Sequence, residues 1–199
     1  MEKIVYTCME KKEITDKNLP VVFEHPEKNL SHHLSRMALK KTLHALDLDP
    51  PDNLILTENY NSIKDRPDIR CSLSHSQEYA AAVASKNQNI LALGIDIELK
   101  SRKIQTKSQA YFLNDEDERS QFSDLELWSI KEACFKAASA LNSNIKLLKD
   151  VTLTSHKQFT FKLAPKGSDC FFACIPDKKL FIMIAGIKAE DFSVPISRL

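Results

Sequence analysis

The sequence predicts an α+β protein, and three observations support this fold class. Residues 30–48 and 124–141 each repeat apolar side chains at the three-to-four-residue period of a helix. Short apolar runs separated by turn-forming residues follow each helix. The order of helix and then strands therefore occurs once on each side of about residue 100. We expect two similar subdomains, 1–100 and 101–199, related by a pseudo-twofold axis with a ligand cleft between them.

The bulk composition is that of a soluble globular protein. Of the 199 residues, 43% are hydrophobic and 28% are charged. The net charge of +1 creates no overall field that would attract nucleic acid or a membrane surface. There is no apolar run of about 18 residues, and the first residues lack the apolar core of a signal peptide. We expect a cytoplasmic monomer that binds neither nucleic acid nor membrane.

Glycine and cysteine counts limit the chemistry further. The only glycines are Gly94, Gly167 and Gly186, so neither a Walker loop nor a Gly-x-Gly-x-x-Gly turn can be built. Any bound phosphate must be held by basic side chains, helix N-termini or a metal ion. The five cysteines are odd in number and scattered, which favours reduced thiols in the core over disulfides or a zinc site.

Local patterns place the elements along the chain. Residues 1–28 read as short strand-like pieces, and the helix over 30–48 should end at Pro50-Pro51. Ser123 and Glu126 form a capping box ahead of the second helix. The strands that we expect in the first half are 53–57, 71–76, 79–85 and 90–97. Those expected in the second half form one antiparallel meander: 151–154, 158–163, 170–175 and 180–187.

Asp96 and Glu98 stand two residues apart at the end of the strand predicted over 90–97. Period-2 alternation directs both side chains to the same side of the sheet. Two carboxylates held so close repel each other unless both are solvated or a cation lies between them. Hard oxygen ligands suit Mg²⁺ or Mn²⁺. The alternative is two solvated carboxylates at a strand end.

The stretch from Trp128 to Lys136 carries a second set of polar groups. On a helix, Trp128, Glu132 and Lys136 lie on one face, because neighbours are three or four residues apart. Glu132 could be a third ligand of the same cation or a base, and Lys131 and Lys136 could meet phosphate oxygens. The alternative is an ordinary amphipathic helix with a surface Glu–Lys pair.

A turn histidine offers a further polar group. His75 lies between Ser74 and Ser76 at a predicted turn, where its imidazole could bind an anion or have no role. A serine hydrolase is disfavoured, because these serines lack the Gly-x-Ser-x-Gly context of a nucleophile elbow.

Taken in order, these segments resemble the 4′-phosphopantetheinyl transferase superfamily, in its larger, pseudo-dimeric Sfp-like branch. Leu93-Gly-Ile-Asp-Ile-Glu98 matches the family's Gly-Ile/Val-Asp-x-Glu motif. Trp128-Ser-Ile-Lys-Glu-Ala-Cys-Phe-Lys136 matches its Trp/Phe-Ser/Ala/Cys-x-Lys-Glu-Ala/Ser-x-x-Lys motif, at a family-like interval. Arg66-Pro67 and the Ser74-His75 segment resemble the branch's basic-Pro and Ser-His-Ser segments. The chain departs from the family pattern at Asp65, where many members have Gly.

The resemblance implies a function and a set of roles. The family transfers 4′-phosphopantetheine from coenzyme A to a serine hydroxyl of an acyl or peptidyl carrier protein and releases 3′,5′-ADP. By resemblance, Asp96, Glu98 and Glu132 surround Mg²⁺, and Glu132 and Lys136 are catalytic. The residues expected to hold coenzyme A are His75, Arg66, Pro67, Ser74, Lys131, Arg36 and Lys40. An inactive relative that binds coenzyme A or a carrier without transfer is the alternative.

Partners follow from the same resemblance. Carrier proteins of this system are acidic, and Lys100, Arg102, Lys103 and Lys107 make one segment of the chain locally basic. This segment is a candidate docking surface, and the alternative is a solvated loop. The carrier that is modified cannot be read from the residues.

Overall fold

The first sheet is built from both ends of the chain. In the computed structural model, which describes residues 3–13, 26–50, 56–57, 61–189 and 196–198, its strand order is β10-β1-β4-β3-β2. The pairs are antiparallel except for the parallel pair of β1 with β10. The elements of this half are β1 (Ile4–Glu10), α1 (Pro26–His44), β2 (Ser62–Ile63), β3 (Arg66–His75), β4 (Tyr79–Ser85) and β10 (Ile196–Arg198).

The second sheet has the order β5-β9-β8 and is antiparallel throughout. A separate two-stranded sheet, β6-β7, lies beside it. The elements of this half are β5 (Ile90–Leu99), α2 (Gln109–Phe112), α3 (Asp124–Leu141), β6 (Val151–Leu153), β7 (Phe159–Phe161), β8 (Ser168–Ile175) and β9 (Leu180–Ala189). Among the described helices, none is long and apolar enough to cross a membrane.

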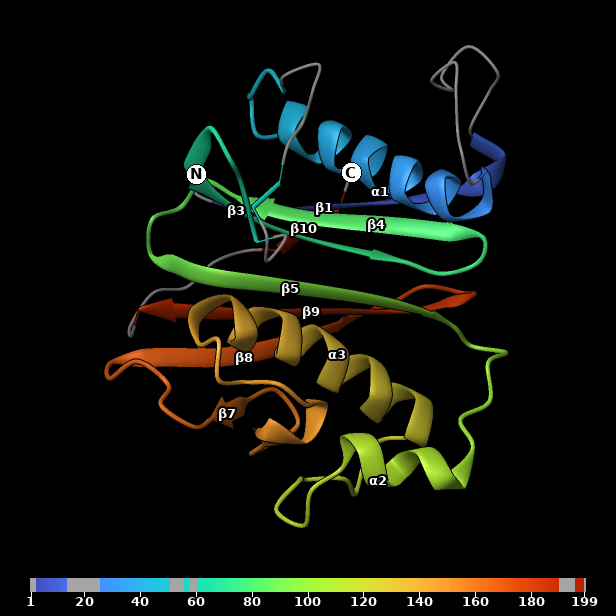
Figure 1. Ribbon diagram of the computed structural model, residues 1–199, viewed down its shortest axis with the longest axis vertical. Helices are drawn as coiled ribbons and strands as arrows, with labels where there is room; N and C mark the ends of the chain where they lie inside the picture. The colour runs from blue at the N-terminus through green and yellow to red at the C-terminus, as the bar shows by residue number, and fades with distance from the viewer. Residues whose placement is uncertain (1–2, 14–25, 51–55, 58–60, 190–195, 199) are drawn as a thin grey trace.

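These elements lie in layers, because alternate side chains of each strand pack against the elements on opposite sides of its sheet (Figure 1). On β4, Ala80 and Ala82 pack against α1, whereas Ala81 and Val83 pack against the second sheet. On β5, the odd-numbered side chains from Leu93 on face the first sheet, and the even-numbered positions face α3. Each sheet thus carries a helix on its outer face and shares an apolar core with the other sheet. The α+β class is confirmed.

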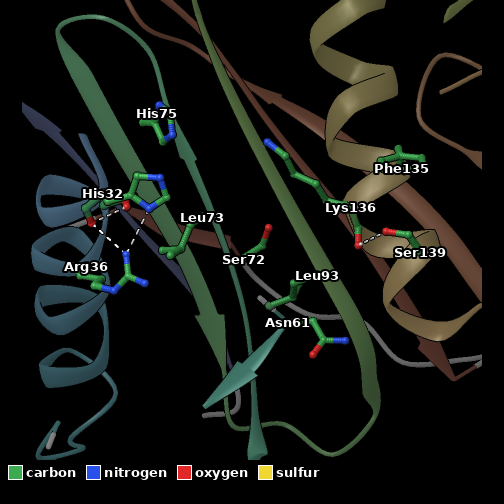
Figure 2. Close-up of a pocket in the computed structure, with 11 residues that line it drawn as sticks. His32, Arg36, Asn61, Ser72, Leu73, His75, Leu93, Phe135, Lys136 and Ser139 are labelled. Atoms are coloured by element: carbon green, nitrogen blue, oxygen red, sulfur yellow. Dashed lines mark hydrogen bonds between the residues drawn. The ribbon is translucent and has the colours of Figure 1, made fainter. Parts of the chain in front are cut away.

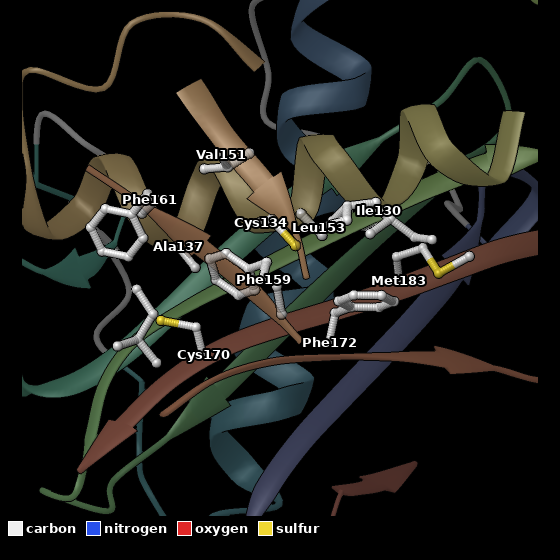
Figure 3. Close-up of a cluster of buried hydrophobic side chains, with 14 of the residues drawn as sticks. Ile130, Cys134, Ala137, Val151, Leu153, Phe159, Phe161, Cys170, Phe172 and Met183 are labelled. Carbon is white, nitrogen blue, oxygen red and sulfur yellow. The ribbon is translucent and has the colours of Figure 1, made fainter. Parts of the chain in front are cut away.

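The largest core fills the space beneath α3 (Figure 3). Ile130, Cys134 and Ala137 of the helix are buried against Met183 of β9 and Phe172 of β8. These positions form the buried face of α3, and their burial fixes the rotation of the helix about its own axis. That rotation determines which α3 side chains face β5.

Several local predictions are confirmed and others need correction. The strand over 79–85 has the predicted bounds, the capping box at Ser123 is present, and α3 ends at Leu141. Helix α1 ends at His44, before the prolines, because the chain turns at Asp47, whose φ of 57° is left-handed. The strand expected over 53–57 lies partly outside the described residues, and its Leu56 forms a single bridge with Ile63.

The predicted meander is divided in two. β6 and β7 pair only with each other, and an isolated bridge between Gln158 and Phe171 links β7 to β8. The division at residue 100 also does not coincide with the division between the sheets, because β5 pairs with β9 and β10 pairs with β1. Two similar subdomains, 1–100 and 101–199, related by a pseudo-twofold axis stay a prediction. Of the cysteines, Cys71, Cys134 and Cys170 are buried as expected, but Cys174 is exposed.

Candidate active site

A cavity of about 320 Å³ lies between the two helices, across β3 and β5 (Figure 2). His32 and Arg36 of α1 border it on one side, and Lys136 and Ser139 of α3 border it on the other. Both halves of the chain therefore contribute to its walls. The remaining lining residues are Ser35, Asn61, Ser72, Leu73, His75, Leu93 and Phe135.

Asp96 is the most completely bonded carboxylate at this junction. Its Oδ1 accepts hydrogen bonds from Ser74 Oγ at 3.0 Å and from Lys136 Nζ at 3.0 Å. Its Oδ2 accepts one from Ser129 Oγ at 2.9 Å. These three donors come from β3 and α3, while Asp96 itself comes from β5. The side chain is only 7% exposed, so the partners fix its position.

Glu98 is held on the same side of β5 by a different pair of groups. Its Oε1 accepts a hydrogen bond from Trp128 Nε1 at 3.2 Å and forms an ion pair with Arg102. The Arg102 guanidinium lies over the Trp128 ring, 5.4 Å from its centre. Both carboxylates of the predicted pair thus face α3, as the alternation predicted.

Glu132 lies close enough to Asp96 and Glu98 for their charges to act on it, but it accepts no hydrogen bond from any described residue. Partial burial raises the pKa of its carboxyl, and the charges of Asp96 and Glu98 raise it further. The Lys136 and Arg102 cations oppose this shift. Glu132 is therefore a desolvated carboxylate without a partner, beside two others that have partners.

Two local features bring α3 into this position. The capping box starts the helix at Asp124, so Trp128, Glu132 and Lys136 follow at four-residue intervals along one face. Gly94 then allows the helix to lie directly on β5, because a Cβ at this position would lie 1.9 Å from the Ala133 carbonyl oxygen.

The opposite wall of the cavity is basic. The His32 and His75 rings have their centres 5.6 Å apart, and Arg36 donates to the His32 carbonyl oxygen at 3.3 Å. The pKa of His75 is lowered by partial burial, and then by the neighbouring His32 and Lys136. This wall is suited to an anion, which would relieve the repulsion among these groups.

A second cavity, of about 530 Å³, continues past His75 to the end of β5. Glu98 and Arg102 line it together with the Ser76–Gln77 turn and the loop at Ser101. His75 borders both cavities, so the two form one elongated site along β3 and β5. Of the three carboxylates, Glu98 lines the second cavity, and Asp96 pairs with Lys136, which lines the first.

One predicted phosphate ligand is wrong. Lys131 is fully buried, and its Nζ donates to both Asp117 carboxylate oxygens at 2.8 Å and to the Val151 carbonyl oxygen. Since consecutive helix residues point about 100° apart, Lys131 cannot share the face of Glu132. Its charge instead ties α3 to the acidic turn and to β6.

Other predicted ligands lie at different distances from the site. Arg66 and Pro67 begin β3, and a ten-residue strand separates Arg66 from His75 by about 30 Å at 3.3 Å per residue. Arg66 pairs with Asp68 instead, so it cannot hold the same phosphate as His75. Ser74 turns its hydroxyl to Asp96. Lys40 lies one turn beyond Arg36 on α1, outside the cavity lining.

Ser129 and Arg102 contact the carboxylates, a role that the sequence did not predict for either; Arg102 was expected only in the basic docking segment. Ser129 lies within the recognised motif, three residues before Glu132, but its bond to Asp96 depends on how close α3 and β5 lie. Arg102 follows Glu98 by four residues, a spacing that carries no signal after a strand. His32 and His33, near the start of the first predicted helix, could bind phosphate or metal or be exposed surface histidines; in the structure His32 borders the cavity beside Arg36.

The donor set fits a hard divalent cation. Asp96, Glu98 and Glu132 supply only carboxylate oxygens, which Mg²⁺ and Mn²⁺ prefer, and Glu132 has no protein partner. Within the described part of the chain, no three carboxylate, imidazole or thiol groups are already arranged around a metal position. Lys136 and Arg102 neutralise Asp96 and Glu98 in this arrangement.

Part of the chain matches the sequence model of a known protein family. No curated protein matches the chain. The sequence model of the 4′-phosphopantetheinyl transferase superfamily matches residues 92–185. This stretch contains both predicted motifs, all three carboxylates and Lys136. Members of the superfamily use coenzyme A and carrier proteins. The match over residues 92–185 supports the 4′-phosphopantetheinyl transferase superfamily as the family that this chain resembles.

Proposed function

We propose that this protein transfers 4′-phosphopantetheine from coenzyme A to a serine hydroxyl of an apo-carrier protein and releases 3′,5′-ADP. One observation carries the proposal. Lys136 of α3 pairs with Asp96 and lines a cavity whose other wall carries Arg36 and His75, and Glu132 lies close enough to Asp96 and Glu98 for their charges to act on it. Carboxylates for a cation and basic groups for phosphates thus lie in one site, without a glycine-rich loop.

The three carboxylates are the proposed metal ligands. Asp96, Glu98 and Glu132 would hold Mg²⁺, with Mn²⁺ as a possible substitute, which when bound neutralises charge on the pyrophosphate oxygens. Ser74 and Ser129 hold Asp96 in place, and Trp128 holds Glu98. These contacts fix the ligand oxygens before substrate arrives, as a preorganised site requires.

Glu132 and Lys136 are the proposed catalytic residues. The raised pKa of Glu132 suits a group that takes the proton of the attacking serine, directly or through a water molecule. Lys136 Nζ lies at the edge of the cavity, where its charge would stabilise the transferring phosphate. The protein supplies positioning and charge, which is most of what this displacement needs.

Phosphates of the nucleotide would bind at the basic wall. His75 and Arg36 face the cavity from β3 and α1, and His32 adds a third group that contacts both. Their mutual repulsion is relieved by an anion, which favours binding there.

The carrier would dock beside the second cavity. Lys100, Arg102, Lys103 and Lys107 are exposed on the segment that leaves β5, and Tyr111 is 74% exposed next to it. An acidic partner fits this segment, and its serine would enter near Glu98. We propose that the protein acts as a cytoplasmic monomer.

The test is intact-mass analysis of a panel of apo-carriers incubated with coenzyme A and Mg²⁺. We expect a carrier to gain the phosphopantetheine mass, and Asp96→Ala and Glu132→Ala to abolish the gain while the circular dichroism spectrum is unchanged. Chelation of divalent ions should also stop transfer. Coenzyme A binding by calorimetry with no modified carrier would instead favour an inactive binding relative.

A further inference from the structure

Arg102 occupies a position that no motif assigned to it. Its guanidinium pairs with Glu98 Oε1, and the same oxygen accepts the Trp128 indole hydrogen at 3.2 Å. The guanidinium carbon is 5.4 Å from the centre of the Trp128 ring, within the range of a cation–π contact. Glu98, Arg102 and Trp128 therefore form one group at the second cavity.

The two internal cations of the site are held differently. Lys136 is 28% exposed and donates to Asp96, to Ser74 and to the Ile95 carbonyl oxygen. Arg102 is 44% exposed and lies in the turn after β5, where its backbone N–H bonds to the Leu99 carbonyl. Arg102 can therefore leave Glu98 for solvent without any movement of β5 or α3.

Electrostatics makes the guanidinium and a divalent cation competitors. Both would bind the Glu98 carboxylate, and two positive groups at one carboxylate repel each other. The uncompensated carboxylate of Glu132 lies beside this pair and draws a cation toward it.

We propose that Arg102 is an internal counter-ion of Glu98, which a divalent cation displaces from Glu98 and from the Trp128 ring when it binds. The inference rests on the proposed metal site. It assigns Arg102 a positioning role: the guanidinium keeps Glu98 neutralised and in place in the metal-free protein. Once displaced from Glu98, the Arg102 guanidinium adds its charge to the other exposed basic side chains of its segment.

The prediction for affinity follows directly. Removing the competitor should tighten cation binding, and an ion pair of this exposure is worth about two- to fivefold in a binding constant. Trp128 is the only tryptophan, so its emission reports on this position alone. Cation binding should change that emission, because it removes the guanidinium from the ring.

The experiment titrates the whole protein with Mg²⁺ and then Mn²⁺ at constant ionic strength, with Trp128 emission and calorimetry as independent readouts. The variants are Arg102→Gln and the matched control Lys103→Gln, which removes the same charge from the next residue, an exposed lysine without a partner in the described structure. We expect about two- to fivefold tighter binding for R102Q and less than twofold change for K103Q. Arg102→Lys, which can still pair with Glu98, should stay within about twofold of wild type.

Equal affinities of R102Q and K103Q would overturn the inference, as would weaker binding by R102Q or no binding to any variant. Carrier modification is measured on the same samples. Wild-type transfer together with an unchanged R102Q affinity would sink the role of Arg102 and leave the transferase intact. Tighter cation binding by R102Q, together with no transfer to any carrier, would support the role of Arg102 and count against the transferase.

Discussion

Gly94 of β5 lies directly beneath the carbonyl oxygen of Ala133 on α3. A Cβ on residue 94 would be 1.9 Å from that oxygen, whereas real Cβ atoms essentially never approach closer than 3.0 Å. This contact sets the distance between the strand that carries Asp96 and the helix that carries Glu132. The glycine of the first motif is therefore needed for close packing between the two elements rather than for a turn.

Gly94→Ala should push α3 away from β5, because backbone atoms on both sides leave no side chain that can yield. We expect a loss of about 1–3 kcal/mol in the free energy of unfolding. A displacement of about 1 Å at the carboxylates should lower kcat/KM for carrier modification about 100-fold. Urea denaturation and initial rates measure the two effects.

Gly186→Ala is the matched control for this substitution. Gly186 lies on β9 opposite Leu93, and its Cβ would meet the Phe171 ring, a side chain that can move. We expect activity within about threefold of wild type whatever the stability cost. Equal losses of activity in the two variants would show that the spacing of α3 and β5 is not what matters.

Glu132→Gln should stabilise the fold while it stops transfer. Because partial burial and two neighbouring carboxylates raise the pKa of Glu132, the folded state binds its proton more tightly than the unfolded state. The resulting destabilisation grows as pH rises from the unfolded pKa through the raised folded pKa. Calorimetry at pH 7.5 should show a Tm about 1–4 °C above wild type.

The gain should vanish once the pH is well below the unfolded pKa of Glu132, because the carboxyl is then protonated in both states. Glu116→Gln removes the same charge from the exposed acidic turn and should change Tm by less than about 1 °C. A lower Tm for E132Q at pH 7.5 would mean that Glu132 has a stabilising partner.

His75 should take up a proton when the nucleotide binds. Its pKa is lowered by burial, His32 and Lys136, and a phosphate at the basic wall would raise it again. Between the lowered and the raised pKa, the affinity for 3′,5′-ADP should improve as pH falls, by at most about tenfold per pH unit. Calorimetry in buffers of different ionisation enthalpy measures the proton uptake.

His75→Gln should remove this proton, whereas His156→Gln, which alters an exposed histidine in another turn, should retain it. The ligand's own phosphate titrates near pH 6 in every variant, so the difference between variants isolates His75. Identical uptake by wild type and H75Q would remove His75 from the phosphate site.

Lys131→Met should lower the free energy of unfolding more than the loss of any surface charge does. The substitution leaves Asp117 buried without its cation, which typically costs about 3–5 kcal/mol. The double variant with Asp117→Asn should recover part of the loss, because the uncompensated charge is gone. A double-mutant cycle in urea measures the coupling.

Arg66→Gln provides the comparison, since the Arg66–Asp68 pair is exposed and should contribute about 1 kcal/mol or less. A small effect of K131M, with altered coenzyme A affinity, would restore the original assignment of Lys131 to phosphate binding.

Much of the local structure could be predicted because it depends on neighbouring residues alone. The capping box at Ser123 and Glu126 starts α3 where expected, and helical spacing puts Trp128, Glu132 and Lys136 on one face. Strand alternation likewise predicted that Asp96 and Glu98 share a side. These periods are set by backbone geometry and need no knowledge of distant contacts.

Predictions that depended on the distance and direction between residues far apart in the chain were less accurate. Arg66 is too far along β3 to join His75, and Lys131 turns into the core to meet Asp117. Both residues carry the right charge, and charge says nothing about distance or direction. The pairing of β5 with β9 is equally invisible in a local pattern, because the partners are about 90 residues apart in sequence.

The sequence by itself determined the class of the fold, the position of α3 and β5, and the residue types that a cation and phosphates require. Only the tertiary structure decided which of those residues meet. Packing at Gly94, the enclosure of Lys131 and the pairing of Arg102 with Glu98 each join groups that are separate in the chain. Local geometry follows from short-range sterics, whereas the site arises from long-range packing of two sheets and two helices, which no short stretch of sequence specifies.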